Sequence, residues 1–157
     1  MYMVGDIPEE VDLYGGSAMV KMVATKVNDY LKSIEAMLIE AVGNSKRFTP
    51  PMPHEKMREL GGNVISYGCN MGEGWVLTAE MMELIHHGFS NIICTQPFGC
   101  LPNHITGKGM IRKIKNICPD ANIVPIDYDP GATKVNQENR IKLMLAVARE
   151  NKNKEAI

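Results

Sequence analysis

Apolar residues recur every three or four positions along residues 17–43, the strongest pattern in the chain. Because an α-helix has 3.6 residues per turn, this spacing places them along one face of a helix. Gly43 directly follows the last apolar residue of this pattern, and glycine is common just after the last turn of a helix. The pattern therefore predicts a helix of about 26 residues, nearly 40 Å long, with a face free to pack on something the chain does not contain. That face comprises Val20, Val23, Val27, Leu31, Ile34, Leu38 and Val42.

A second pattern begins after the breaker "NSKRFTPPMPH" (44–54), where short apolar runs alternate with helical segments. The runs 63–67, 91–95 and 122–127 are rich in β-branched residues and are predicted strands. Pro125 lies inside the last run, which indicates an edge strand or a bulge.

Helical segments separate these predicted strands. The segment 78–88 carries start and stop signals, with Thr78 as N-cap and Gly88 at its end. Further helices are predicted at 54–60, closed by Gly61 and Gly62, at 105–118, with Met110, Ile111, Ile114 and Ile117 on one side, and at 133–150.

Repeated strand–helix units with short connections predict a parallel sheet with right-handed crossovers. We therefore predict an α/β fold: a three-layer Rossmann-like domain with a small, mainly parallel sheet and a long N-terminal helix. Residues 1–47 would form a helical lead-in and residues 48–157 the α/β domain. The small sheet also suggests a piece of a larger protein.

The charge balance argues against functions that depend on binding nucleic acid or an anionic membrane. The formal net charge of −1 and a pI of about 6.4 create no field that would attract nucleic acid or an anionic membrane. No apolar stretch approaches the roughly 20 residues needed to span a bilayer. The acidic start "MYMVGDIPEEVDLYGG" lacks the features of a signal peptide, so we expect a cytoplasmic protein with its four cysteines reduced.

The predicted topology gathers polar residues at one edge of the sheet. In open parallel sheets, ligands bind outside the carboxyl ends of the strands. The loops expected there are 68–75, 96–103 and 127–133, and His104 opens the helix after the second loop. These loops hold Cys69, Glu73, Trp75, Cys100, Asp127, Tyr128 and Asp129.

Each of these residues also has an ordinary structural interpretation. Cys69 is either an exposed thiol in a turn or part of the site, whereas Cys94 and Cys118, at the ends of apolar runs, are expected to pack in the core. Cys100 precedes a helix, whose N-terminal dipole favours a thiolate. His104 could be a ligand, an anion contact or an ordinary hydrogen-bonding residue.

Other site types have weak support. Asp127 and Asp129 surround a proline in a sequence typical of a turn. The glycine pairs "GEGW" and "GKGM" match no nucleotide-binding motif, although a phosphate on either loop stays an alternative. A zinc site built from Cys69, Cys94, Cys100 and His104 is not selected by any spacing rule.

The segments "GEGW", "QPFGCLPNH", "GKGMI", "IDYDPG" and "NRIKLML" occur in an order that suggests a family. Over about residues 50–148, the chain resembles the C-terminal part of the large proteins related to 2-hydroxyacyl-CoA dehydratase activases. These proteins fuse activase-like and dehydratase-subunit-like segments. No segment resembles the ATP-hydrolysing fold of the activase itself.

The resemblance implies a cofactor and a reaction class. Dehydratase subunits consist of Rossmann-like domains that hold a [4Fe-4S] cluster through cysteines from more than one domain. Cys100, in "PFGCLP", matches the ligand from the last domain, while Cys69, Glu73, His104, Asp127 and Asp129 would line the crevice. The parent would serve electron transfer or radical dehydration of a CoA-thioester.

The chain alone would lack the other cluster ligands, so we expect the [4Fe-4S] cluster to be present in the parent but absent from this chain, and the chain to be inactive without its parent. Its expected partners are other domains of the parent polypeptide or a dehydratase subunit. A homodimer through the long helix is a further expectation. The alternatives are a non-catalytic docking or scaffold domain and a phosphate- or nucleotide-binding module.

Overall fold

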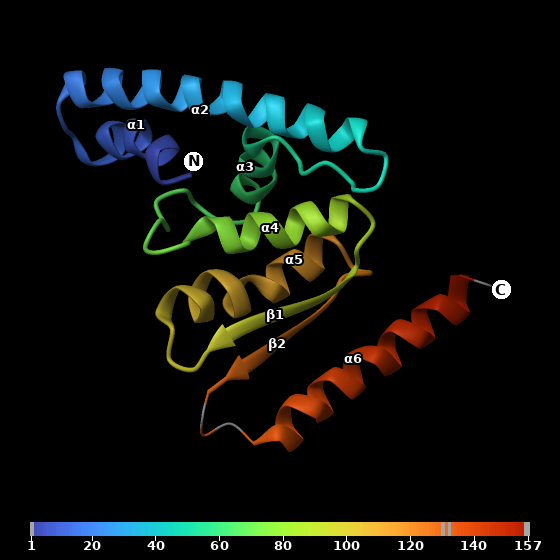
Figure 1. Cartoon of the computed structure of the whole chain (residues 1–157). Coiled ribbons are helices and arrows are strands. Elements are labelled where there is room, and N and C mark those ends of the chain that lie inside the picture. The colour runs from blue at the N-terminus through green and yellow to red at the C-terminus, as the bar shows by residue number, and fades with distance from the viewer. Residues whose placement is uncertain (1, 130, 132, 156–157) are drawn as a thin grey trace. The chain divides into compact units, whose positions relative to one another are not determined.

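A computed structural model describes residues 2–129, 131 and 133–155 (Figure 1). These residues form a mixed α/β structure with six α-helices and a two-stranded parallel sheet. The chain divides into two compact units, residues 1–59 and 60–157. None of the described helices combines the length and apolar character needed to cross a bilayer.

The described part of the first unit consists of helices and their connecting loops, and it contains the predicted long helix. It comprises α1 (Tyr2–Tyr14), α2 (Ala18–Asn44) and most of α3 (His54–Gly62), with α1 and α2 side by side (Figure 1). Ala24 of α2 is buried in this unit. An ion pair of 2.5 Å joins Lys21 of α2 to Asp12 of α1, and another of 2.5 Å joins Lys32 of α2 to Glu55 of α3.

The prediction that Gly43 ends the long helix is wrong. The helix continues to Asn44, and Ser45 closes it through its backbone N–H and its hydroxyl, which both donate to the Val42 carbonyl. Lys46 then takes the left-handed conformation, with φ of 54°. A serine cap therefore satisfies the last turn, and no glycine is needed there.

The second unit contains the sheet and five further helical segments, three of them α-helices. In chain order these are α4 (Trp75–His86), β1 (Asn91–Pro97), a π-helical turn η1 (Asn103–Gly107), a 3₁₀ turn η2 (Lys108–Met110), α5 (Ile111–Ile117), β2 (Asn122–Tyr128) and α6 (Lys134–Glu155).

The two strands pair in parallel, as the sequence predicts, with Asn91 opposite Asn122 and Gln96 opposite Asp127. One core cluster joins α4, α5 and both strands, and α6 contacts β2. The buried amide of Asn122 links β2 to β1 and to α6, because its Nδ2 donates to Asn91 Oδ1 and to the Met144 carbonyl at 2.9 Å each. The buried members of the cluster are Val64, Met81, Met82, Ile92, Ile114, Ala121 and Ile123.

The predicted strand at 63–67 is wrong. The chain leaves α3 in a tight turn, in which the N–H groups of Val64 and Ile65 both donate to the Gly61 carbonyl. Both side chains are buried, so hydrophobic burial explains this apolar run without any strand pairing. The sheet consequently has two strands among the described residues, not three.

Two helix predictions also need correction. The helix predicted from Thr78 begins at Trp75, and the hydroxyl of Thr78 is buried inside it, where it donates to the Thr106 carbonyl. The helix predicted at 105–118 forms as π, 3₁₀ and α turns from Asn103 to Ile117. Ile114 is fully buried, but Ile117 is 47% exposed and leaves the core face.

The predicted glycine stop of α4 is confirmed. Gly88 has φ of 86°, its N–H donates to the Ile85 carbonyl, and the N–H of Phe89 donates to the Leu84 carbonyl. This pair of bonds is the Schellman motif, which uses the left-handed conformation that glycine adopts easily. The motif turns the chain directly into β1.

Candidate functional site

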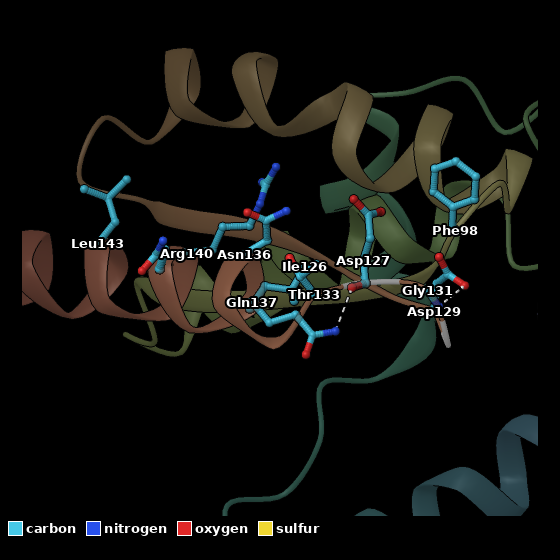
Figure 2. Close-up of a pocket in the computed structure, with 11 residues that line it drawn as sticks. Phe98, Ile126, Asp127, Asp129, Gly131, Thr133, Asn136, Gln137, Arg140 and Leu143 are labelled. Atoms are coloured by element: carbon cyan, nitrogen blue, oxygen red, sulfur yellow. Dashed lines mark hydrogen bonds between the residues drawn. The ribbon is translucent and has the colours of Figure 1, made fainter.

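The carboxyl ends of β1 and β2 lie side by side, and a polar cleft opens beside the end of β2 (Figure 2). The cleft has a volume of about 540 Å³, within the range of small-molecule sites. Its walls come from the end of β2, the following loop, the first turns of α6 and Phe98 after β1. The lining residues are Phe98, Ile126, Asp127, Asp129, Gly131, Thr133, Asn136, Gln137, Asn139, Arg140 and Leu143.

Asp127 is held at this cleft by hydrogen bonds from two glutamine side chains. Its Oδ1 accepts a 2.6 Å hydrogen bond from Nε2 of Gln96, the residue opposite it in the strand register. Its backbone carbonyl accepts a 3.1 Å bond from Nε2 of Gln137 on α6. Figure 2 shows the Gln137 side chain reaching back to the strand end. Both strands and α6 therefore fix the position of Asp127.

Gln96 carries an unusual buried acceptor. The residue is 1% exposed, and its Oε1 has no hydrogen-bond partner among the described residues. Its amide orientation is set by Asp127, because only the NH₂ end can donate to a carboxylate. A buried carbonyl without a donor costs about 1–3 kcal/mol. The end of β1 is thus equipped to accept an N–H or O–H group.

Cys100 lies in the loop after β1, immediately before a helical turn. Its carbonyl accepts the N–H of His104 at 3.0 Å, and Cys100 directly precedes the helical residues that begin at Leu101. The thiol is half-buried, and its Sγ accepts a 3.0 Å hydrogen bond from Nδ2 of Asn103. A donor of this kind stabilises the negative charge of a thiolate. The local structure therefore suits a sulfur ligand or nucleophile.

His104 connects the cysteine loop to Asp127. Its Nδ1 lies 3.0 Å from the Cys100 carbonyl, which can only accept, so this nitrogen carries a proton. Its Nε2 then faces Asp127 Oδ1 at 3.8 Å. The structure thus brings Cys100, His104 and Asp127 into one chain of contacts.

Cys69 approaches the same loop from another direction. It lines a small apolar pocket of about 140 Å³ together with Leu101 and Pro102, which directly follow Cys100. Gly72 also lies against Pro102, since an added Cβ would come within 3.3 Å of the proline ring. Loop 68–75 therefore packs on the cysteine loop, as expected for neighbouring loops at one edge of a domain.

Glu73 and Asp129 have separate surroundings. Glu73 is exposed before α4 and does not line the cleft that holds Asp127 and Asp129. Burial of the Glu80 carboxyl and the negative charges of Glu73 and Glu83 raise the pKa of Glu80. Asp129 accepts a 3.0 Å hydrogen bond from the Gly131 N–H, which matches the turn chemistry expected from its sequence.

Three backbone amides in or beside the glycine loops donate to carbonyls of the chain. The N–H of Trp75 donates to the Cys69 carbonyl at 2.7 Å, and the N–H of Val76 donates to the Glu73 carbonyl at 3.0 Å. In the second loop, the N–H of Lys108 donates to the carbonyls of Asn103 and His104. A phosphate would need such groups to point outward.

Gln96, Asn103, Gln137 and Arg140 are polar neighbours of the site that sequence reasoning missed. One signal was present, because "NIICTQ" and "NIVPID" both begin with Asn-Ile. Aligning these segments as parallel partners sets Gln96 opposite Asp127, which is the observed register. Arg140, whose Nη1 donates to the Pro125 carbonyl at 3.1 Å, has no comparable signal.

Cys94 and Cys118 pack against the core cluster, as predicted. Burial raises the pKa of the Cys94 thiol. Since the thiolate is the reactive form, we expect iodoacetamide at pH 7 to alkylate Cys94 more slowly than Cys100 in the folded chain. Mass spectrometry of the alkylated peptides measures both rates. Equal rates in the folded chain, with equal rates in urea as the control, would contradict this assignment.

Comparison of the chain with protein-family models, curated proteins and solved structures found no match. Among the described residues, no group of three or more His, Cys, Asp or Glu side chains is arranged to hold a metal ion. The thiol of Cys100 fits one ligand position of an iron–sulfur cluster, but the described residues do not form a complete cluster site.

Proposed function

We propose that residues 60–157 form a ligand-presenting domain in which Cys100 supplies one thiolate to an iron–sulfur cluster. The observation that carries the proposal is the setting of this thiol, half-buried just before a helical turn with the Asn103 amide donating to its sulfur. Iron–sulfur clusters are held by thiolates, and hydrogen bonds to sulfur tune their potentials. The remaining ligands would come from another domain or subunit.

The resemblance to dehydratase-related proteins supports the wider setting. A cluster shared in this way would serve electron transfer or radical dehydration of a CoA-thioester, and this chain would be inactive alone. A substrate or a neighbouring domain would bind in the polar cleft at the end of β2 and would donate a hydrogen bond to the Gln96 Oε1. A Rossmann-like, three-layer arrangement and a cytoplasmic location belong to the same proposal, supported by the parallel strand pairing and four free cysteines.

Ligand exchange tests the role of Cys100 without requiring the missing domain. A synthetic [4Fe-4S] cluster carrying small, exchangeable thiolates is mixed anaerobically with the chain, because one protein thiolate can replace one small thiolate. We expect the chain to retain the brown cluster through gel filtration, and Cys100→Ala to lose most of it. Iron content and visible absorption measure retention.

Cys118→Ala is the matched control, because this thiol packs against the core at a distance along the chain from the loop. It should retain the cluster as the unmodified chain does. Cys69→Ala tests whether the neighbouring thiol shares the site. If Cys100→Ala retained as much cluster as the unmodified chain, that result would contradict the proposal.

A docking role is the second candidate, and a separate observation favours it. Large apolar side chains of α2 are exposed to solvent, whereas most large apolar side chains in folded proteins are buried. The exposed set comprises Met19, Val20, Met22, Val23, Val27, Tyr30, Met37 and Leu38.

A further inference from the structure

The exposed apolar side chains of α2 contain a heptad pattern. Spacings of three and four alternate without interruption, which is the pattern of a coiled-coil contact. We define the α2 seam as Val20, Val23, Val27, Tyr30, Ile34, Met37 and Ala41.

The seam is largely open to solvent. Val20, Val23, Val27, Tyr30 and Met37 are 42–66% exposed. The contact of α2 with α1 uses a different face, on which Ala24 is buried and Asn28 faces Gly5 of α1. The first unit therefore folds without covering the seam.

We propose that the α2 seam binds the same seam of a second copy of this chain in an antiparallel, two-fold symmetric pair. In that register Val23 packs against Ala41, Val27 against Met37 and Tyr30 against Ile34, each contact occurring twice by symmetry. Large side chains thus meet smaller or flexible ones along about 30 Å of helix. This inference is independent of the cluster proposal.

Charge selects the antiparallel direction. Lys26 and Glu40 are the charged residues directly beside the seam on its polar flank, and both are exposed. In an antiparallel pair, Lys26 of each copy lies beside Glu40 of the other, so two opposite-charge contacts form. In a parallel pair, Lys26 would face Leu31 of the second copy, and neither charge would gain a partner. Electrostatic complementarity therefore fixes orientation and register.

Sedimentation of the full chain tests the dimer. We expect a dimer at micromolar concentration, and we expect Val27→Glu to raise the dissociation constant by about 100-fold or more, because it puts unpaired carboxylates into the contact. Val27 is exposed in the first unit, so circular dichroism should show unchanged helix content. Thr25→Glu, an exposed position of α2 away from the seam, is the matched control and should leave the dimer intact.

Charge reversal tests the register. Lys26→Glu and Glu40→Lys should each weaken the self-dimer by roughly tenfold, because each replaces both attractive contacts by repulsive ones. Mixing the two variants should restore a heterodimer of nearly the original affinity. A monomer at about 100 μM, as would occur if residues 60–157 covered the seam, would overturn the proposal. A dimer indifferent to Val27→Glu, or variants that fail to recover on mixing, would overturn it equally.

Discussion

Replacing Trp75 by alanine is expected to unfold the second unit. Trp75 is the largest fully buried side chain, at 0% exposure, and it packs edge-on against the Tyr67 ring with centroids 5.4 Å apart. Trp-to-Ala changes in cores cost about 3–5 kcal/mol. Small domains are stable by only about 5–15 kcal/mol, so this loss removes much of the total.

Amide hydrogen exchange of peptides from α4 and β1 measures the effect of Trp75→Ala directly in the second unit. Protection of these peptides should fall sharply, and urea denaturation followed by circular dichroism should show a lower midpoint. Phe98→Ala is the matched aromatic control, because Phe98 is 73% exposed and its loss should change stability by less than about 0.5 kcal/mol. Native-like protection in Trp75→Ala would show that the core does not depend on this ring.

Gly74→Ala should be the next most damaging change. Gly74 has φ of 51°, and an added Cβ would lie 2.2 Å from the Cys69 carbonyl oxygen and 2.7 Å from the Asn70 Cα. With φ of 51° and ψ of −130°, Gly74 lies outside the regions that other residues usually adopt, and such a positive φ costs them about 1–2 kcal/mol. The backbone collision adds about 1–3 kcal/mol, because neither neighbouring backbone atom can rotate away.

Gly99→Ala separates these two costs. Gly99 also has a positive φ, of 73°, but nothing lies within 4 Å of an added Cβ. We therefore expect a loss of about 1–2 kcal/mol for Gly99→Ala and roughly 2–5 kcal/mol for Gly74→Ala. Urea denaturation followed by the fluorescence of Trp75, the single tryptophan, measures both. Equal losses would mean that the loop before α4 can shift to accept the methyl group.

The elements that the sequence predicted well are those with a clear period or a clear stop. The long helix carries its apolar spacing over many turns, and Gly88 supplies the left-handed residue that ends α4. The two strands combine β-branched residues with flanking polar residues, and their boundaries agree closely with β1 and β2. In each case the local pattern and the packing favour the same structure.

The failures have a common physical origin in tertiary packing. A short apolar run such as Val64 and Ile65 can be buried in a turn as well as in a strand, and period alone does not separate these outcomes. Thr78 has the side chain of an N-cap, yet its hydroxyl finds the Thr106 carbonyl inside the helix.

The candidate site divides in the same way. Topology alone brought the loops of Cys100 and Asp127 to one edge of the sheet, because parallel strands end together. The hydrogen bonds from Gln96, Asn103 and Gln137 depend on strand register, on a π-helical turn and on the packing of α6. None of these follows from the order of residues without the fold.

The double anchoring of Asp127 has a consequence for any molecule that enters the cleft. Gln96 holds its carboxylate and Gln137 holds its carbonyl before anything binds. The entropy needed to order this side chain is therefore lost during folding, and an incoming group meets a preorganised acceptor. The affinity of a ligand for this cleft should consequently depend on how well its donor group fits the fixed Asp127 carboxylate, with little adjustment of the protein.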